Sequence, residues 1–88
     1  MTDTFLNVGF GNLVSPDRII AIVVPDSAPI KRLVQEAKDG GNAIDVSCGR
    51  KTRSVLITDS GHVIMSAIQV DTLKSRLSGN NVPDDADQ

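Results

Sequence analysis

The chain has 88 residues, of which 40% are hydrophobic; this suffices for one small domain and excludes multidomain enzyme architectures. Its single cysteine, Cys48, excludes an intramolecular disulfide and a cysteine-based zinc site. The net charge of −2 reflects three aspartates in the last five residues. We therefore expect one nearly neutral domain over residues 1–80, followed by a disordered acidic tail over residues 81–88.

The apolar runs bear on where the protein acts. The longest one, residues 19–25, is far shorter than the roughly 20 residues of a membrane span. The N-terminus lacks the basic start and apolar stretch of a signal peptide. These features predict a cytoplasmic protein without membrane association, and a small core without a disulfide favours self-association.

The first third of the chain predicts short strands separated by turns. Residues 5–8 form a short apolar run, and the glycines of residues 9–12 indicate a structural turn before Leu13 and Val14. The Ser15-Pro16-Asp17 segment predicts a tight turn or one helical turn. Residues 18–24 are continuously apolar after Arg18, so we expect a strand buried on both faces or at an interface.

The middle of the chain predicts one amphipathic helix. Asp26 or Ser27 can cap its start, and Pro29 fits its first turn. The apolar positions recur with helical spacing along one face, and the glycines at 40 and 41 end the helix. The face comprises Ile30, Leu33, Val34 and Ala37.

The remaining elements are strands and a final helix. Residues 43–47, 55–57 and 62–68 have strand character, with a hairpin signal at residues 59–61. Residues 70–77 place Leu73, Arg76 and Leu77 on one helical face. The expected elements follow the order β-β-α-β-β-β-α. This order predicts an α+β fold with a mainly antiparallel sheet and two helices.

No constellation in the sequence supports catalysis or metal binding. Nothing in the sequence places Cys48 beside His62, the single histidine; we expect Cys48 to pack at a strand end and His62 to be a solvated residue next to a turn. Carboxylates are scattered rather than clustered, and the GxG of residues 9–11 lacks the rest of a nucleotide-binding fingerprint. We predict no enzyme activity, catalytic residue, metal or cofactor.

Basic residues carry the clearest chemical signal. The connector over residues 49–53 holds Arg50, Lys51 and Arg53, with the hydroxyl of Thr52 between them, and suits phosphate oxygens. A solvated loop is the alternative. Arg18 stands at a strand edge, where a surface pair with Asp17 or Asp26 would also explain it.

Two more cations and the aromatic content refine the expected ligand. Lys31 and Arg32 open the helix, where cations are slightly unfavourable, which can indicate an external anion. The chain has two phenylalanines, which we assign to the core or an interface, and no tyrosine or tryptophan. Single-stranded nucleic acids are commonly bound on aromatic platforms, so a duplex backbone fits this composition better.

Three segments resemble a known family. VGFGNLVSPDRIIAIV, PDSAPIKRLVQEAKD and GRKTRSVLITDSGHVIMSAIQVDTL are similar to the RemA family of bacterial extracellular-matrix (biofilm) regulators, over residues 5–77. The resemblance implies a DNA-binding transcription regulator with a fold like LytTR-type domains, assembled as a homo-oligomeric ring. It also implies that Arg18 and Arg50 contact DNA on the ring rim.

The sequence departs from the family pattern at two places. Lys51 stands where the family usually has a second arginine, which keeps the charge and loses the bidentate fork. Gln69-Val70 replaces an expected proline at the start of the last helix.

We therefore expect a nucleoid-associated regulator that binds double-stranded DNA. Its candidate contacts are Arg18, Lys31, Arg32, Arg50, Lys51, Thr52 and Arg53. Repeated contacts around a ring would bend or wrap the duplex. A protein-binding scaffold and a structured-RNA binder are the alternatives.

Overall fold

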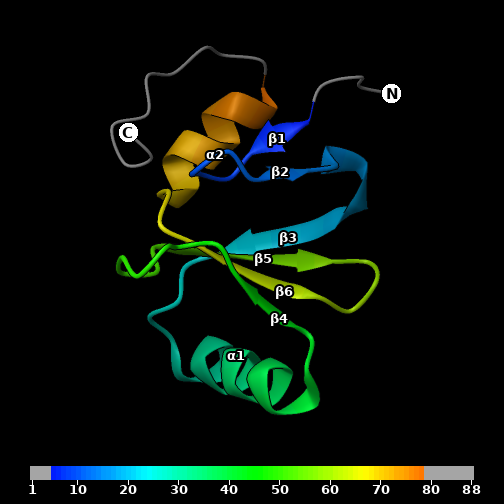
Figure 1. The fold of residues 1–88 in the computed structure, drawn as a ribbon, viewed down its shortest axis with the longest axis vertical. Coiled ribbons are helices and arrows are strands. Elements are labelled where there is room, and N and C mark those ends of the chain that lie inside the picture. The colour runs from blue at the N-terminus through cyan, green and yellow to red at the C-terminus, as the bar shows by residue number, and fades with distance from the viewer. Residues whose placement is uncertain (1–4, 79–88) are drawn as a thin grey trace.

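The computed structural model describes residues 5–78, so the predicted acidic tail lies outside the described residues. Along the chain the elements are β1 (Leu6–Asn7), β2 (Leu13–Val14), the 3-10 helix η1 (Pro16–Arg18), β3 (Ile19–Val23), α1 (Ala28–Gly40), β4 (Ala43–Asp45), β5 (Ser54–Thr58), β6 (Val63–Ser66) and α2 (Val70–Leu77) (Figure 1). The predicted α+β class with two helices is confirmed. The predicted order lacked one strand before α1, because Leu13–Val14 forms a strand of its own.

The strands form two sheets rather than one. β1 and β2 make a small antiparallel pair, and the larger sheet has the order β3-β5-β6-β4. Within it β3–β5 and β5–β6 are antiparallel, whereas β4 lies parallel to β6. The sheet is therefore mixed, because the chain leaves β4, passes through the connector to β5 and returns through the hairpin as β6.

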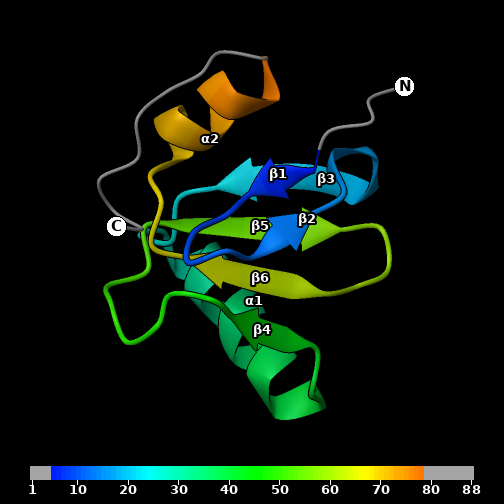
Figure 2. The same cartoon turned by 45° about the horizontal axis from the view of Figure 1, so that its top comes forward.

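The larger sheet separates two apolar cores. Figures 1 and 2 show α1 on one of its faces and α2 with the β1–β2 pair on the other. Side chains alternate between the two faces along each strand: Leu56 and Ile64 contact the core under α2, whereas Val55 and Val63 contact the core over α1. Leu73 of α2 is fully buried in the first core.

The helix ends follow the predicted local signals. Ser27 caps α1, because its Oγ accepts a hydrogen bond from the Ile30 amide at 3.4 Å. Gly41 ends the helix in a left-handed conformation with φ of 80°. In contrast, Gln69 begins α2 without a side-chain cap.

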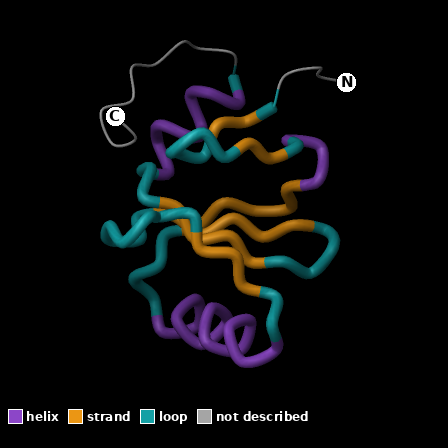
Figure 3. The backbone as a smooth tube through the Cα atoms, viewed as in Figure 1, coloured by secondary structure: helices purple, strands orange, loops and turns teal. Residues whose placement is uncertain are grey.

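β3 is not buried on both faces. It is one of the two edge strands of the larger sheet, as the tube in Figure 3 also shows. A bulge interrupts its pairing with β5 between Ile19 and Ala21, and Ile20 is 68% exposed. Val24, just after the strand, is 53% exposed. The first of the two predicted settings, burial on both faces, is therefore wrong, because Ile20 projects into solvent and no residue of β3 is fully buried.

Several smaller expectations also change. Phe5 is 60% exposed, so it is not a core residue, and Cys48 is exposed rather than packed. His62 precedes β6 and its Nδ1 lies 2.8 Å from the Ser60 hydroxyl, which agrees with a place beside the turn. Within residues 5–78, neither helix has the length and apolar character needed to cross a bilayer.

Candidate nucleic-acid interface

The basic connector between β4 and β5 is anchored at both ends. At its start, Asp45 accepts hydrogen bonds from the Ser47 hydroxyl at 2.6 Å and from the Ser47 amide at 2.9 Å. These bonds hold the pKa of the Asp45 carboxyl below its usual value, and the bond from the Ser47 hydroxyl has the largest effect. At its end, the Arg53 amide donates to the Ser66 carbonyl at 2.8 Å.

A tight turn then directs the basic side chains outward. The Arg50 amide donates to the Ser47 carbonyl at 3.0 Å, and Cys48 and Gly49 between them have φ of 55° and 81°. Positive φ at both central positions is typical of a type I′ turn, which glycine adopts readily. The turn brings the chain back toward the sheet, so Arg50, Lys51 and Arg53 follow one another along the molecular surface.

The three connector cations are solvent-exposed. Thr52 between them is half-buried. Within the described part of the chain, no carboxylate forms an ion pair with Arg50, Lys51 or Arg53. Their charge is therefore not neutralised by an ion pair within residues 5–78.

Arg50 is also supported by an aromatic ring. Its guanidinium carbon lies 5.6 Å from the centroid of Phe10, within the range of a cation–π interaction. Phe10 sits at φ of 55° between Gly9 and Gly11, in a turn closed by the Asn12 amide and the Gly9 carbonyl at 3.0 Å. The turn at residues 9–12 therefore places the Phe10 ring against Arg50, which lies 40 residues later in the chain.

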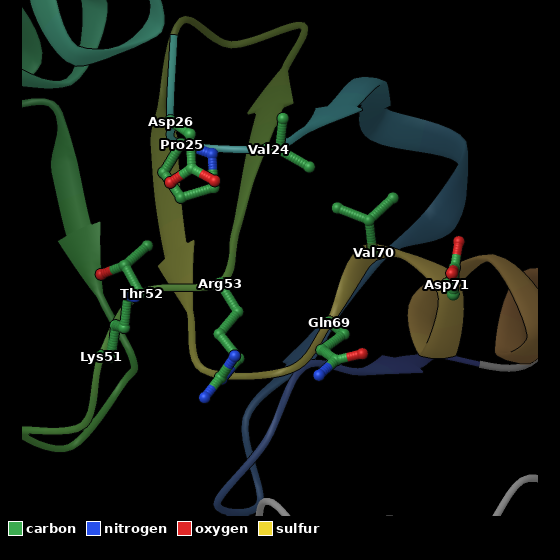
Figure 4. Close-up of a pocket in the computed structure, with 9 residues that line it drawn as sticks. All are labelled: Val24, Pro25, Asp26, Lys51, Thr52, Arg53, Gln69, Val70 and Asp71. Carbon is green, nitrogen blue, oxygen red and sulfur yellow. The ribbon is translucent and has the colours of Figure 1, made fainter.

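A cavity opens beside the second half of the connector. It has a volume of about 310 Å³ and is lined by Val24, Pro25, Asp26, Lys51, Thr52, Arg53, Gln69, Val70 and Asp71. Figure 4 shows the ends of the Arg53 and Gln69 side chains in the opening between the connector and the start of α2. The lining includes two cations, one amide and two carboxylates, so the cavity has mixed polarity. These groups belong to Lys51, Arg53, Gln69, Asp26 and Asp71.

The two basic residues of α1 have different positions. Lys31 lines a second cavity of about 230 Å³ together with Thr52 and Val55, so it lies beside the connector. Arg32 is exposed on α1 and lines neither of these two cavities. The structure therefore groups Lys31 with the connector and leaves Arg32 apart.

Arg18 lies at the opposite end of the larger sheet. Because β3 and β5 are antiparallel, Arg18 precedes β3 where β5 ends, whereas the connector enters β5 at its beginning. The five residues of β5 span about 17 Å. A single chain therefore does not bring Arg18 and the connector cations to the same point.

The partner of Arg18 differs from both predicted ones. Its Nε donates to Oδ1 of Asp59 at 3.0 Å, rather than to Asp17 or Asp26. Asp59 follows β5 in the hairpin, 41 residues away in sequence. Spacing along the chain gives no signal for this pair.

Sequence reasoning also missed Phe10 and Gln69. Phe10 was assigned to the core or an interface, yet its ring supports Arg50. A large aromatic residue flanked by two glycines in a turn is a signal that it reaches another segment. Gln69 lines the connector cavity, and its signal was the departure from the expected proline.

Comparison with known proteins identifies the family of the chain. The family model "RemA-like: Extracellular matrix regulatory protein A-like" matches residues 5–77. A relative from Synechococcus elongatus is 58% identical over 77 residues, covering 88% of each chain. One from Halothermothrix orenii is 56% identical over 81 residues, covering 92% of this chain and 96% of the relative.

A third relative, from Clostridium acetobutylicum, is 54% identical over 87 residues, covering 94% of this chain and 95% of the relative. All three carry the name "Putative regulatory protein". The family match covers almost the whole described region, and the three relatives are matched over 88–96% of their own length, so the chain belongs to the RemA-like family of extracellular matrix regulatory proteins.

Proposed function

We propose that this protein is a transcription regulator that binds duplex DNA through basic residues repeated around a homo-oligomeric ring. The observation that carries the proposal is the exposed connector with Arg50, Lys51 and Arg53, which form no ion pair with a carboxylate of residues 5–78. Guanidinium and ammonium groups suit phosphate oxygens, and Thr52 adds a hydroxyl donor. The regulatory names of the family and the relatives agree with this role.

Self-association would supply the additional phosphate contacts that one subunit lacks. The four cations of one subunit would neutralise about two to four phosphates, which gives only weak, non-specific affinity. Since Arg18 and the connector lie at opposite ends of the sheet, several subunits along one duplex are needed to bring both kinds of contact to nearby phosphates. A curved row of such contacts would bend or wrap the DNA, so sequence preference would come largely from DNA deformability.

Exposed apolar residues support the oligomer. Ile20 on the edge strand β3 is 68% exposed, and Ile44 on the other edge strand, β4, is 43% exposed. Unpaired strand edges and exposed branched side chains favour association with another chain. Because the two edges differ, a contact between them would be head-to-tail, and such an interface forms a ring when its rotation closes.

A binding titration tests the proposal. We would follow fluorescence anisotropy of a labelled duplex of about 40 base pairs at about 50 and 200 mM salt, and measure oligomer mass by light scattering. Tight binding that falls by about a hundredfold or more at the higher salt supports several phosphate contacts per assembly. Arg50→Ala should weaken binding across different sequences and leave the oligomer mass unchanged.

Other outcomes would identify another function. An oligomer that binds no duplex at the lower salt refutes the DNA proposal and favours a protein-binding scaffold. Tighter binding to a matched RNA duplex than to DNA favours a structured-RNA binder. Control of matrix genes is the biological role that the family description suggests, and the regulator would then act at the nucleoid.

A further inference from the structure

The pairing of Arg18 with Asp59 is unusual for a surface that would bind an anion. Arg18 is a candidate phosphate contact, yet its Nε donates to a carboxylate oxygen of Asp59 at 3.0 Å. The side chains of Arg18 and Asp59 are 63% and 47% exposed, so the pair contributes little to the stability of the fold. The pair is therefore not part of the packing that holds the fold together.

The geometry of the pair leaves the arginine available. A guanidinium has one donor at Nε and two terminal amino groups, and the bond to Asp59 uses the Nε donor. Neither terminal amino group makes a hydrogen bond within residues 5–78. The two terminal amino groups of Arg18 therefore stay available for a bidentate contact with a phosphate, while Asp59 holds the Nε edge.

The backbone holds both residues in this arrangement. The Asp59 amide donates to the Arg18 carbonyl at 2.9 Å, and the Arg18 amide donates to the Ser15 carbonyl at 3.1 Å. The backbone hydrogen bond therefore holds Asp59 next to the start of β3 independently of the contacts of its side chain. Its carboxylate can then restrict the rotamers of a long side chain that would otherwise be mobile.

We infer that Asp59 is a positioning residue for Arg18: it holds the Nε edge of the guanidinium so that the terminal amino groups meet a DNA phosphate. The inference rests on the proposed DNA-binding function. Ordering an arginine before binding reduces the entropy lost on binding, which amounts to about a two- to tenfold gain in affinity for each engaged subunit. The alternative is that the Asp59 carboxylate competes with phosphate and weakens binding.

Variants of the pair separate these two roles. Asp59→Ala should weaken duplex binding about two- to tenfold for each engaged subunit, whereas Asp59→Asn keeps an acceptor oxygen and should bind at least as tightly as wild type. In an Arg18→Ala background, Asp59→Ala should have no further effect, because the two changes act through one contact. Asp17→Ala is the matched control: it removes an exposed carboxylate beside Arg18 that forms no ion pair within residues 5–78, so it should not weaken binding.

Tighter binding by Asp59→Ala would overturn the inference and identify Asp59 as a competitor of phosphate. Equal weakening by Asp59→Ala with and without Arg18 would also overturn it, because the effect would then be a general one on the hairpin. Melting temperatures of all variants, measured by circular dichroism, would identify such a general effect.

A second readout does not depend on DNA. In the NMR spectrum of the protein alone, the Arg18 Nε–H signal should be protected from exchange in wild type and Asp59→Asn, and lost in Asp59→Ala. The same exchange rate in wild type and Asp59→Ala would refute the positioning role. If the wild-type protein bound no duplex while the Nε–H signal behaved as expected, the proposed function would fail and the ordering of Arg18 by Asp59 would stand.

Discussion

Replacement of Lys51 by alanine tests the phosphate contacts most directly. Lys51 is exposed on the connector, forms no ion pair within residues 5–78 and lacks the aromatic support that Arg50 has. It therefore acts as a point charge, and its removal should change the electrostatic part of binding with little effect on packing.

The expected magnitude follows from counterion release. Each phosphate contact contributes about −0.9 to the slope of log affinity against log salt, or about a 3.5-fold loss between about 50 and 200 mM. Four such contacts in the assembly, from Arg18, Arg50, Lys51 and Arg53, would give about a 150-fold loss, and three contacts about a 40-fold loss. Lys51→Ala should thus make the slope shallower by about 0.9 for each engaged subunit.

The assay is anisotropy of the same duplex at five or more salt concentrations. Lys74→Ala is the matched control, because it removes an exposed lysine of α2 that is not one of the candidate contacts. The reasoning would be refuted if Lys51→Ala kept the wild-type slope, or if Lys74→Ala changed the slope by the same amount.

Three further outcomes follow from the structure and the sequence. Ile20→Lys places a charge at the most exposed apolar position of β3 and should reduce oligomer mass in light scattering; an unchanged mass would exclude this edge from the interface. Ser66→Ala should lower the free energy of unfolding by about 1–3 kcal/mol in urea titrations, because the Ser66 hydroxyl donates to the Val8 carbonyl and accepts from the Ile68 amide. Ser54→Ala is its control, since the buried Ser54 hydroxyl makes no hydrogen bond within residues 5–78, and an equal loss there would contradict the assignment. Deletion of residues 81–88 should tighten DNA binding at low salt if the acidic tail competes with DNA; unchanged affinity would reduce the tail to a solubilising segment.

Local signals in the sequence were sufficient for much of the fold. The start and end of α1 depend on Ser27 and Gly41, which act on backbone groups of the adjacent turn. The hairpin at residues 59–61, α2 and the exposed basic connector could also be predicted, because each is contained in a window of a few residues. The family resemblance came from the same short motifs and is confirmed by the match over residues 5–77.

The tertiary structure decided which distant residues meet. That β4 pairs parallel to β6, and that β3 is an edge with Ile20 exposed, depends on strand pairing across long loops. The same pairing places Asp59 beside Arg18 and puts Arg18 and the connector at opposite ends of the sheet. Such contacts form only when loops close and apolar faces are buried together, so neither spacing nor periodicity along the chain determines them.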